Sequence, residues 1–188
     1  MTLNEIFSEL STHMISGMMV HEQLMVRYWF LNLPGYAKCH EYHYLSETIG
    51  HNRLLEFVTN RYDYLVSPGV PSDPGLISKK LYETRRDHVS IEERVEVIDS
   101  TFDEWIRWES ETLNLYKSAY SYLLSANEID AANFISKYID DVSNELIYAK
   151  TEQLAKASMN YDMPTIIAEQ EAYVKKFTKK IRKLKEFK

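Results

Sequence analysis

The sequence contains little glycine and proline, and this shortage limits its fold. Among 188 residues there are five Gly and five Pro, and three of the prolines and two of the glycines fall between Ser67 and Gly75. A fold with many strands needs turn residues throughout the chain, and this sequence does not have them. All-β and doubly wound α/β folds are therefore excluded, and long helices are favoured.

Cysteine and long apolar runs are also scarce. The single cysteine, Cys39, excludes an intramolecular disulfide and a cysteine-rich zinc site. The sequence has no apolar run of 18 residues and no signal-type N-terminus, so we expect a soluble, cytoplasmic protein. Hydrophobic residues make up 45% of the chain, which is enough to build the core of one domain.

Negative charge dominates except at the C-terminus. The net charge is −6, but the segment Lys175–Lys188 has eight basic residues and one acid, so the rest of the chain carries −13. Apolar residues recur in this part at spacings of three and four, namely Val174, Phe177, Ile181, Leu184 and Phe187. We expect a basic amphipathic helix that packs on the bundle or on another subunit. The alternatives are nucleic-acid binding through Lys175–Lys188 and docking to an anionic surface.

Two capping boxes and the few turn residues divide the chain into helices. Thr2 with Glu5 and Ser90 with Glu93 have the spacing of a capping box, so each pair predicts a helix start. The predicted helices run from Thr2 to Asn32, Tyr36 to Leu65, Ile91 to Leu124, Glu128 to Asn160 and from Pro164 onward, with a short helix at 76–87. Short turns and one long connection predict an all-α four-helix bundle over residues 1–160, with a crossover at 66–90 and an additional C-terminal helix at 161–188.

Each long helix carries an acid, or an acid and a histidine, inside its apolar stripe. Glu22 interrupts the stripe of the first helix, which we assign to Ile15, Met18, Met19, Met25, Val26, Trp29 and Leu33. The other interruptions are Glu47 and His51 on the second helix, Glu109 on the third and Glu145 on the fourth. Counted from the turns, all lie at nearly the same level. We expect His40 and His43 at the rim and His21 in solvent.

Buried carboxylates at one level must be neutralised, because desolvation and mutual repulsion otherwise raise their pKa values until they bind protons. No Lys or Arg occupies the inward stripes at this level. A multivalent cation therefore explains the pattern, and carboxylate oxygens with an imidazole suit iron or manganese. The predicted metal ligands are Glu22, Glu47, His51, Glu109 and Glu145.

At these residues the chain resembles the ferritin-like superfamily of carboxylate di-iron proteins. Glu22, His51, Glu109 and Glu145 match the family's ligand positions on helices one to four. The family pattern Glu-x-x-His is incomplete, because Thr48 stands where a bridging Glu is normal and Tyr148 stands where a second His is found. Glu47 would therefore have to reach in from one residue earlier.

The resemblance implies a ferritin-like fold and a non-haem di-iron protein that binds and oxidises Fe(II), as a ferroxidase for iron storage or detoxification. Its cofactor would be a di-iron centre, with manganese as the alternative, and its partners would be metal ions and further copies of the chain in a homo-oligomer. Two other functions remain open: a di-metal oxidoreductase or oxygenase that acts on an organic substrate, and a metal-free bundle with a structural or interaction role.

Overall fold

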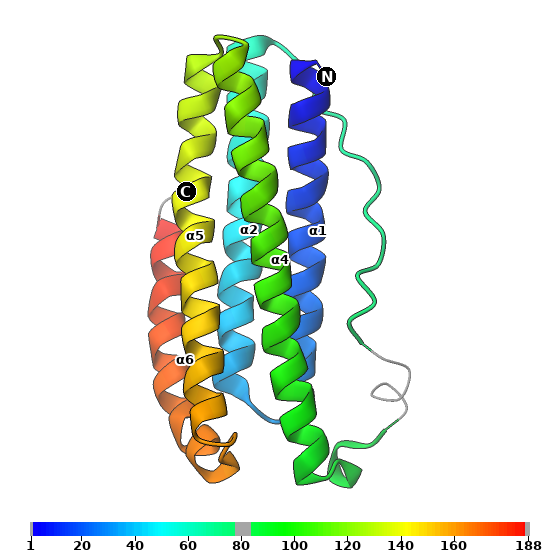
Figure 1. Cartoon of the computed structure of the whole chain (residues 1–188), viewed down its shortest axis with the longest axis vertical. Helices are drawn as coiled ribbons and strands as arrows, with labels where there is room; N and C mark the ends of the chain where they lie inside the picture. The colour runs from blue at the N-terminus through cyan, green and yellow to red at the C-terminus, as the bar shows by residue number, and fades with distance from the viewer. Residues whose placement is uncertain (1, 78–83, 187–188) are drawn as a thin grey trace.

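The computed structural model describes residues 2–77 and 84–186, and its regular structure there is entirely helical. The long helices are α1 (Leu3–Phe30), α2 (Pro34–Tyr62), α4 (Ile91–Ser125), α5 (Ile129–Ser158) and α6 (Met163–Glu186), with a short 3-10 helix, η1 (Arg86–His88), before α4. In Figure 1, α1, α2, α4 and α5 form an elongated bundle, and α6 lies along one side of it. The predicted all-α fold is confirmed.

Local sequence explains where the helices begin and turn. Both predicted capping boxes are present, with Thr2 capping α1 and Ser90 capping α4. Asn32 and Asn127, in the turns after α1 and α4, have φ values of 59° and 62°. Asparagine tolerates this left-handed conformation better than most residues, so each helix can end abruptly and reverse. The pairs α1–α2 and α4–α5 are consequently antiparallel.

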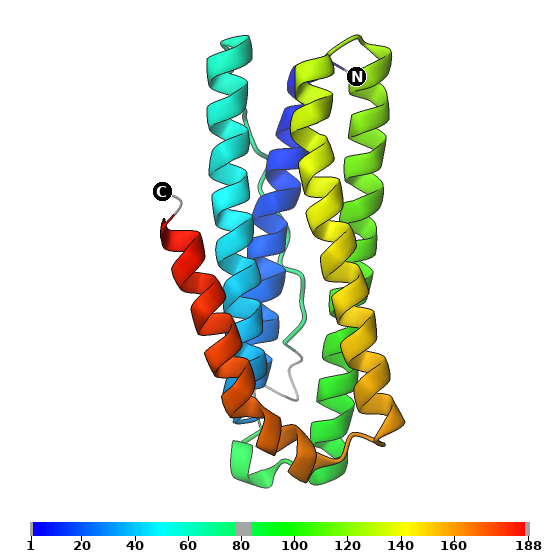
Figure 2. The same cartoon turned by 90° about the vertical axis from the view of Figure 1, so that its left-hand side faces the viewer.

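The crossover between α2 and α4 returns along the outside of α1 (Figures 1 and 2). The backbone amide of Gly69 donates to the Thr12 hydroxyl at 2.7 Å, and that of Leu76 donates to the Gln23 side-chain oxygen at 2.8 Å. This route makes α2 and α4 parallel, as the long connection predicts. The sequence predicts a short helix at 76–87, and positions 78–83 of it lie outside the described residues. Among the described positions of this segment, helical structure begins at Arg86, in η1.

The C-terminal helix α6 packs against α2. The side-chain oxygen of Gln170 accepts hydrogen bonds from the backbone amides of Gly35 (2.9 Å) and Tyr36 (3.2 Å), so α6 caps the N-terminus of α2. Phe177 and Ile181 are buried, as expected for an apolar face that packs on the bundle. Of the expected apolar stripe, Phe187 lies outside the described residues, as does the terminal Lys188.

The buried apolar residues form two clusters at different levels of the bundle. We call the cluster near the start of α1 the upper cluster; it includes Phe7, Leu10, Leu54, Val58, Leu123 and Ile135. The lower cluster includes Leu24, Tyr28, Tyr36, Phe102, Trp105 and Phe177, and so draws on α6 as well. Polar side chains face inward at the level where the clusters meet. No helix in the described part of the chain is long and apolar enough to cross a membrane.

Candidate metal centre

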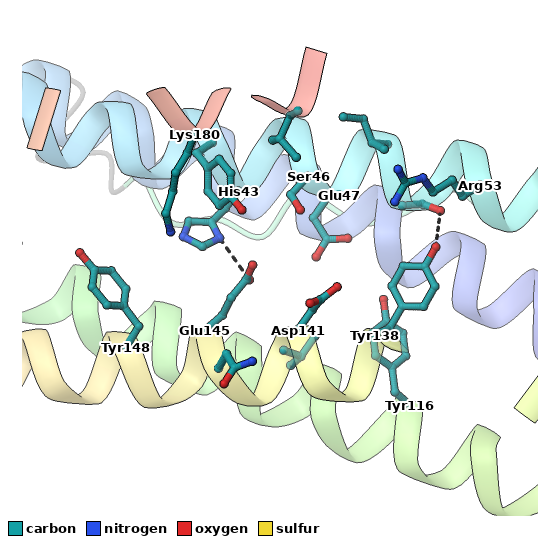
Figure 3. A pocket seen from close by; sticks show the side chains of 16 residues that line it. His43, Ser46, Glu47, Arg53, Tyr116, Tyr138, Asp141, Glu145, Tyr148 and Lys180 are labelled. Atoms are coloured by element: carbon teal, nitrogen blue, oxygen red, sulfur yellow. Dashed lines mark hydrogen bonds and ion pairs between the residues drawn. The ribbon is translucent and has the colours of Figure 1, made fainter. Parts of the chain in front are cut away.

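Five ionisable side chains face the interior between the upper and lower clusters, and we call them the polar layer. They are His21 from α1, His43 and Glu47 from α2, Glu109 from α4 and Glu145 from α5. Figure 3 shows His43 and Glu47 facing Glu145 across the space between α2 and α5. All four helices of the bundle thus contribute to one level of the core.

Glu109 and His21 form the inner part of the layer, and both are fully buried. The Trp105 indole donates to Glu109 Oε1 at 3.0 Å, and His21 Nε2 lies 3.5 Å from the same oxygen. Burial, reinforced by the charge of Glu145, raises the pKa of Glu109 to about 8, and burial lowers the pKa of His21 to about 4. Both groups are therefore mainly uncharged at neutral pH, so their contact is not an ion pair.

His43 and Glu145 form the outer part of the layer. His43 Nδ1 lies 3.1 Å from Glu145 Oε2, and the side chain of Glu145 is 21% exposed. Burial acts to raise the pKa of Glu145, but the charge of the adjacent His43 outweighs it, and the net pKa is lowered. The layer therefore keeps one carboxylate ionised beside an imidazole and holds Glu109 protonated.

Glu47 completes the layer because Gly17 leaves room for it. A Cβ atom at position 17 would lie 3.2 Å from the carboxyl carbon of Glu47 and 3.2 Å from the ring of Trp108, which is closer than most side-chain contacts. Burial and the charges of Glu109 and Glu145 raise the pKa of Glu47 well above its ordinary value. Without bound cations, protons on Glu47 and Glu109 therefore neutralise most of the layer.

Four atoms of the layer are buried without a hydrogen-bond partner, namely His21 Nε2, both ring nitrogens of His43, and Glu109 Oε2. Buried polar atoms are normally paired, so unpaired ones suggest that the layer accommodates another species. Imidazole nitrogens with carboxylate oxygens are donors that fit iron or manganese. Within residues 2–77 and 84–186, no three His, Cys, Asp or Glu side chains are already grouped as ligands of one ion. Binding would therefore require side-chain rotation.

The structure brings together Glu47, Glu109 and Glu145 of the predicted ligand set, but not Glu22. Glu22 is exposed, and its neighbour His21 faces the interior. The predicted stripe on α1 was wrong by one residue, since Val26 and Trp29 are 43% and 49% exposed. The buried face of α1 instead combines apolar residues such as Met14, Val20, Leu24 and Tyr28 with Ser11, Gly17 and His21. These three small or polar residues interrupt the apolar pattern on that face.

His51 also lies apart from the carboxylates. Its Nε2 is 2.8 Å from the Ser11 hydroxyl, one helical turn from Glu47 toward the upper cluster. Nearby, the Thr48 hydroxyl donates to the backbone oxygen of Tyr44 at 2.8 Å, within its own helix. The second helix therefore presents Glu47 and His43 to the layer, in place of the expected Glu47 and His51.

Three histidines that we expected at the rim or in solvent are buried. His21, His40 and His43 are at most 3% exposed. The Nδ1 atoms of His21 and His40 lie 3.1 Å apart, so His40 supports His21 from behind. The spacing His40-x-x-His43-x-x-x-Glu47 places these three residues on one helical face, and this signal could have identified them from the sequence.

A cavity of about 370 Å³ adjoins the layer between α2 and α5 (Figure 3). His43, Glu47 and Glu145 line its inner wall, and Arg53 and Lys180 lie at opposite ends. Tyrosine rings supply much of the remaining surface, from Tyr42, Tyr116, Tyr138 and Tyr148. The polar layer is thus reachable from outside through a space much larger than a metal ion needs.

No family model and no curated protein matches this sequence. Among solved structures, the fold is similar to that of a humanized archaeal ferritin, with a TM-score of 0.71 and 11% sequence identity. The alignment covers 91% of this chain and 94% of that chain. The chain therefore has a ferritin-like four-helix bundle with an additional C-terminal helix, as the sequence resemblance implies.

Proposed function

We propose that this chain binds iron in the polar layer and oxidises Fe(II) with O₂ or peroxide, for iron storage or detoxification. The observation that carries the proposal is the set of unpartnered atoms on buried His21, His43 and Glu109 at the middle of a ferritin-like bundle. A cation is the species that would engage imidazole and carboxylate groups together.

The side chains that would hold the metal are His21, His43, Glu47, Glu109 and Glu145. Fe(II) is the substrate: two ions each lose one electron, and O₂ takes up two electrons and two protons to become hydrogen peroxide. Metal entry would displace the protons that burial places on Glu47 and Glu109, since carboxylates bind metals in the deprotonated form. Trp105 would orient Glu109 through its indole hydrogen bond.

Anaerobic titration with Fe(II), followed by exposure to O₂, tests this function. We expect saturable binding of up to two ions per chain and an absorbance typical of di-ferric centres after oxidation. Glu109→Ala and Glu145→Ala should lose most of the binding, whereas Asp140→Asn, an exposed acid on α5, should retain it. Absence of uptake by the wild type, or full uptake by Glu109→Ala, would overturn the proposal. The mass of the same sample in solution tests the expected homo-oligomer.

The cavity favours a second candidate function, oxidation of an organic substrate by the same metal centre. Its volume of about 370 Å³ and its tyrosine-rich wall exceed what ion passage requires. Ser46→Phe fills the cavity and distinguishes the two functions. If this variant oxidises Fe(II) as well as the wild type does, storage or detoxification is favoured. If it loses turnover of an organic substrate while its metal content is unchanged, an oxidase is favoured.

A further inference from the structure

Two buried histidines from different helices, His21 and His40, meet through the same ring atom. Their Nδ1 atoms lie 3.1 Å apart, and the residues are 0% and 1% exposed. A hydrogen bond between two nitrogens contains one hydrogen, so one ring must donate and the other accept. Burial lowers the pKa of His21 to about 4 and that of His40 well below its ordinary value, so each ring is neutral and carries one proton. The two rings are therefore opposite tautomers.

The surroundings of the second nitrogen of each ring decide which ring donates. His21 Nε2 lies 3.5 Å from Glu109 Oε1, which is longer than an ordinary N–H···O hydrogen bond. The same oxygen already accepts the Trp105 indole at 3.0 Å. Because His21 Nε2 is buried without a hydrogen-bond partner, a proton on it would be a buried donor with no acceptor, which is unfavourable.

The second nitrogen of His40 has different surroundings. Unlike His21 Nε2, it is not one of the buried unpartnered atoms of the described chain. His40 lines a cavity of about 10 Å³, which is enough for one water molecule, and its Nδ1 is engaged by His21. Tyr36 lines the same cavity, and its buried hydroxyl lacks a partner in the chain. A proton on His40 Nε2 can thus be met by water, so the arrangement in which His21 donates is favoured.

Aromatic side chains hold the His40 ring in place. Tyr28 stacks on it with ring centres 5.5 Å apart and an angle of 15°, and Trp105 meets it edge-on at 4.8 Å. Both aromatic residues are buried, at 1% and 2% exposure. His40 therefore cannot turn its Nδ1 away from His21 without displacing buried side chains.

We propose that His40 is a positioning residue that accepts the Nδ1 proton of His21 and so leaves His21 Nε2 without a proton, facing Glu109. A metal ion binds the bare nitrogen of a neutral imidazole, and the hydrogen bond at the other nitrogen determines which one is bare. The use of this nitrogen as a ligand rests on the proposed function, whereas the tautomer does not. His21 would then bind a cation without losing a proton, and the protons released would come from Glu47 and Glu109.

Nitrogen-15 NMR of the whole chain, labelled at histidine and kept in chelator, tests the tautomer directly. A bare ring nitrogen and a protonated one have well-separated resonances, and the His21 signals are identified by their absence in His21→Gln. We expect the wild type to carry the His21 proton on Nδ1 and none on Nε2. A His21 ring protonated at Nε2 in the wild type would overturn the proposal.

Variants at position 40 test whether His40 causes this preference. His40→Leu removes the acceptor, so His21 should lose its preference for the Nδ1 proton, and Zn(II) affinity should fall on the order of tenfold. His40→Asn retains an acceptor oxygen and should keep the wild-type tautomer and most of the affinity. His13→Leu, which removes another histidine of α1 with a side-chain partner, Thr112 at 2.8 Å, is the control and should change neither.

An unchanged His21 tautomer in His40→Leu would overturn the proposal, as would loss of the tautomer in His40→Asn. If His40→Leu does not fold, the wild-type spectrum and His40→Asn still decide the question. Calorimetry with Zn(II), a diamagnetic probe, is carried out on the same samples. Zn(II) binding to a wild type with His21 protonated at Nε2 would overturn the role of His40 and leave the proposed iron function intact. The expected tautomer without Zn(II) binding would support the role of His40 and count against the metal centre.

Discussion

The upper cluster and the polar layer lie at neighbouring levels of the same four helices, yet their interiors differ in kind. In the upper cluster, Phe7, Leu10 and Leu54 are completely buried among other apolar side chains. In the polar layer, Glu109 and His21 are equally buried, but each retains an atom without a hydrogen-bond partner. Close packing of apolar side chains satisfies the upper cluster. The polar layer, by contrast, needs protons or a cation to neutralise its buried carboxylates.

This difference separates stability from function within one bundle. Apolar burial stabilises the folded chain by about 25 cal/mol per Å², while each unpaired buried polar group costs about 1–3 kcal/mol. The polar layer therefore lowers the stability of the fold, and the clusters above and below it supply the compensation. Substitutions at the two levels should accordingly have effects of opposite sign, and three predictions test this.

The largest effect should come from the upper cluster. Leu54→Ala removes a completely buried side chain, and we expect the free energy of unfolding to fall by about 3 kcal/mol. Urea denaturation measures this loss, and Leu65→Ala, at a position 85% exposed, is the control that should change little. Iron binding per folded chain should be unaffected. A loss of less than about 1 kcal/mol would show that this level is loosely packed.

A smaller effect of opposite sign should come from Glu109→Gln in chelated protein. Burial raises the pKa of Glu109 from 4.5 to about 8, so folding at neutral pH requires a proton that the unfolded chain lacks. Wild-type stability from this group is fully present below pH 4.5 and is lost as the pH rises toward 8. Glutamine avoids this cost, so the variant should be more stable at pH 7, by on the order of 2 kcal/mol.

Denaturation at pH 5 and pH 7, with and without Mn(II), checks the sign of this effect. The advantage of Glu109→Gln should shrink at pH 5, and added Mn(II) should stabilise the wild type more than the variant. Glu111→Gln, at an exposed site on the same helix, should show neither behaviour. If Glu109→Gln were less stable than the wild type in chelator, Glu109 would be ionised in the folded chain.

The smallest effect should come from Glu22→Gln. Because the Glu22 side chain is exposed, we expect its removal to change the free energy of unfolding by less than about 0.5 kcal/mol and to leave Fe(II) binding intact. Isothermal titration with Fe(II) under argon compares the variant with Glu109→Gln, which should bind less. Weaker binding by Glu22→Gln would restore the sequence-based ligand set and refute an α1 register in which His21 faces the interior.

The fold could be predicted because its determinants are local. Capping boxes at Thr2 and Ser90 fix two helix starts, and scarce turn residues leave one long connection. The stripe of α4 was equally clear, since Phe102, Trp105 and Tyr116 are large and all face inward around Glu109. Where large apolar residues mark the buried face, the sequence predicts both the face and the charge within it.

The remaining site residues could not be found in this way, because they depend on contacts between helices. Gly17 is buried because the side chains of Glu47 and Trp108 occupy the space beside it. His21 is buried because its ring contacts Glu109 and His40. None of these partners is close in sequence. The methionines and Trp29 on the neighbouring face of α1 produced a stronger apolar signal, which displaced the predicted register by one residue.

The contact between Gly35 and Gln170 makes the chain unusually sensitive to mutation at a position that has no side chain. A single added carbon at residue 35 would lie 2.6 Å from the backbone oxygen of Gln170. That backbone cannot yield as a flexible side chain would, so even Gly35→Ala would push α6 away from α2. Lys180 belongs to the same helix. Tolerance to mutation in the first turn of α2 is thus linked to the shape of a cavity farther along the bundle.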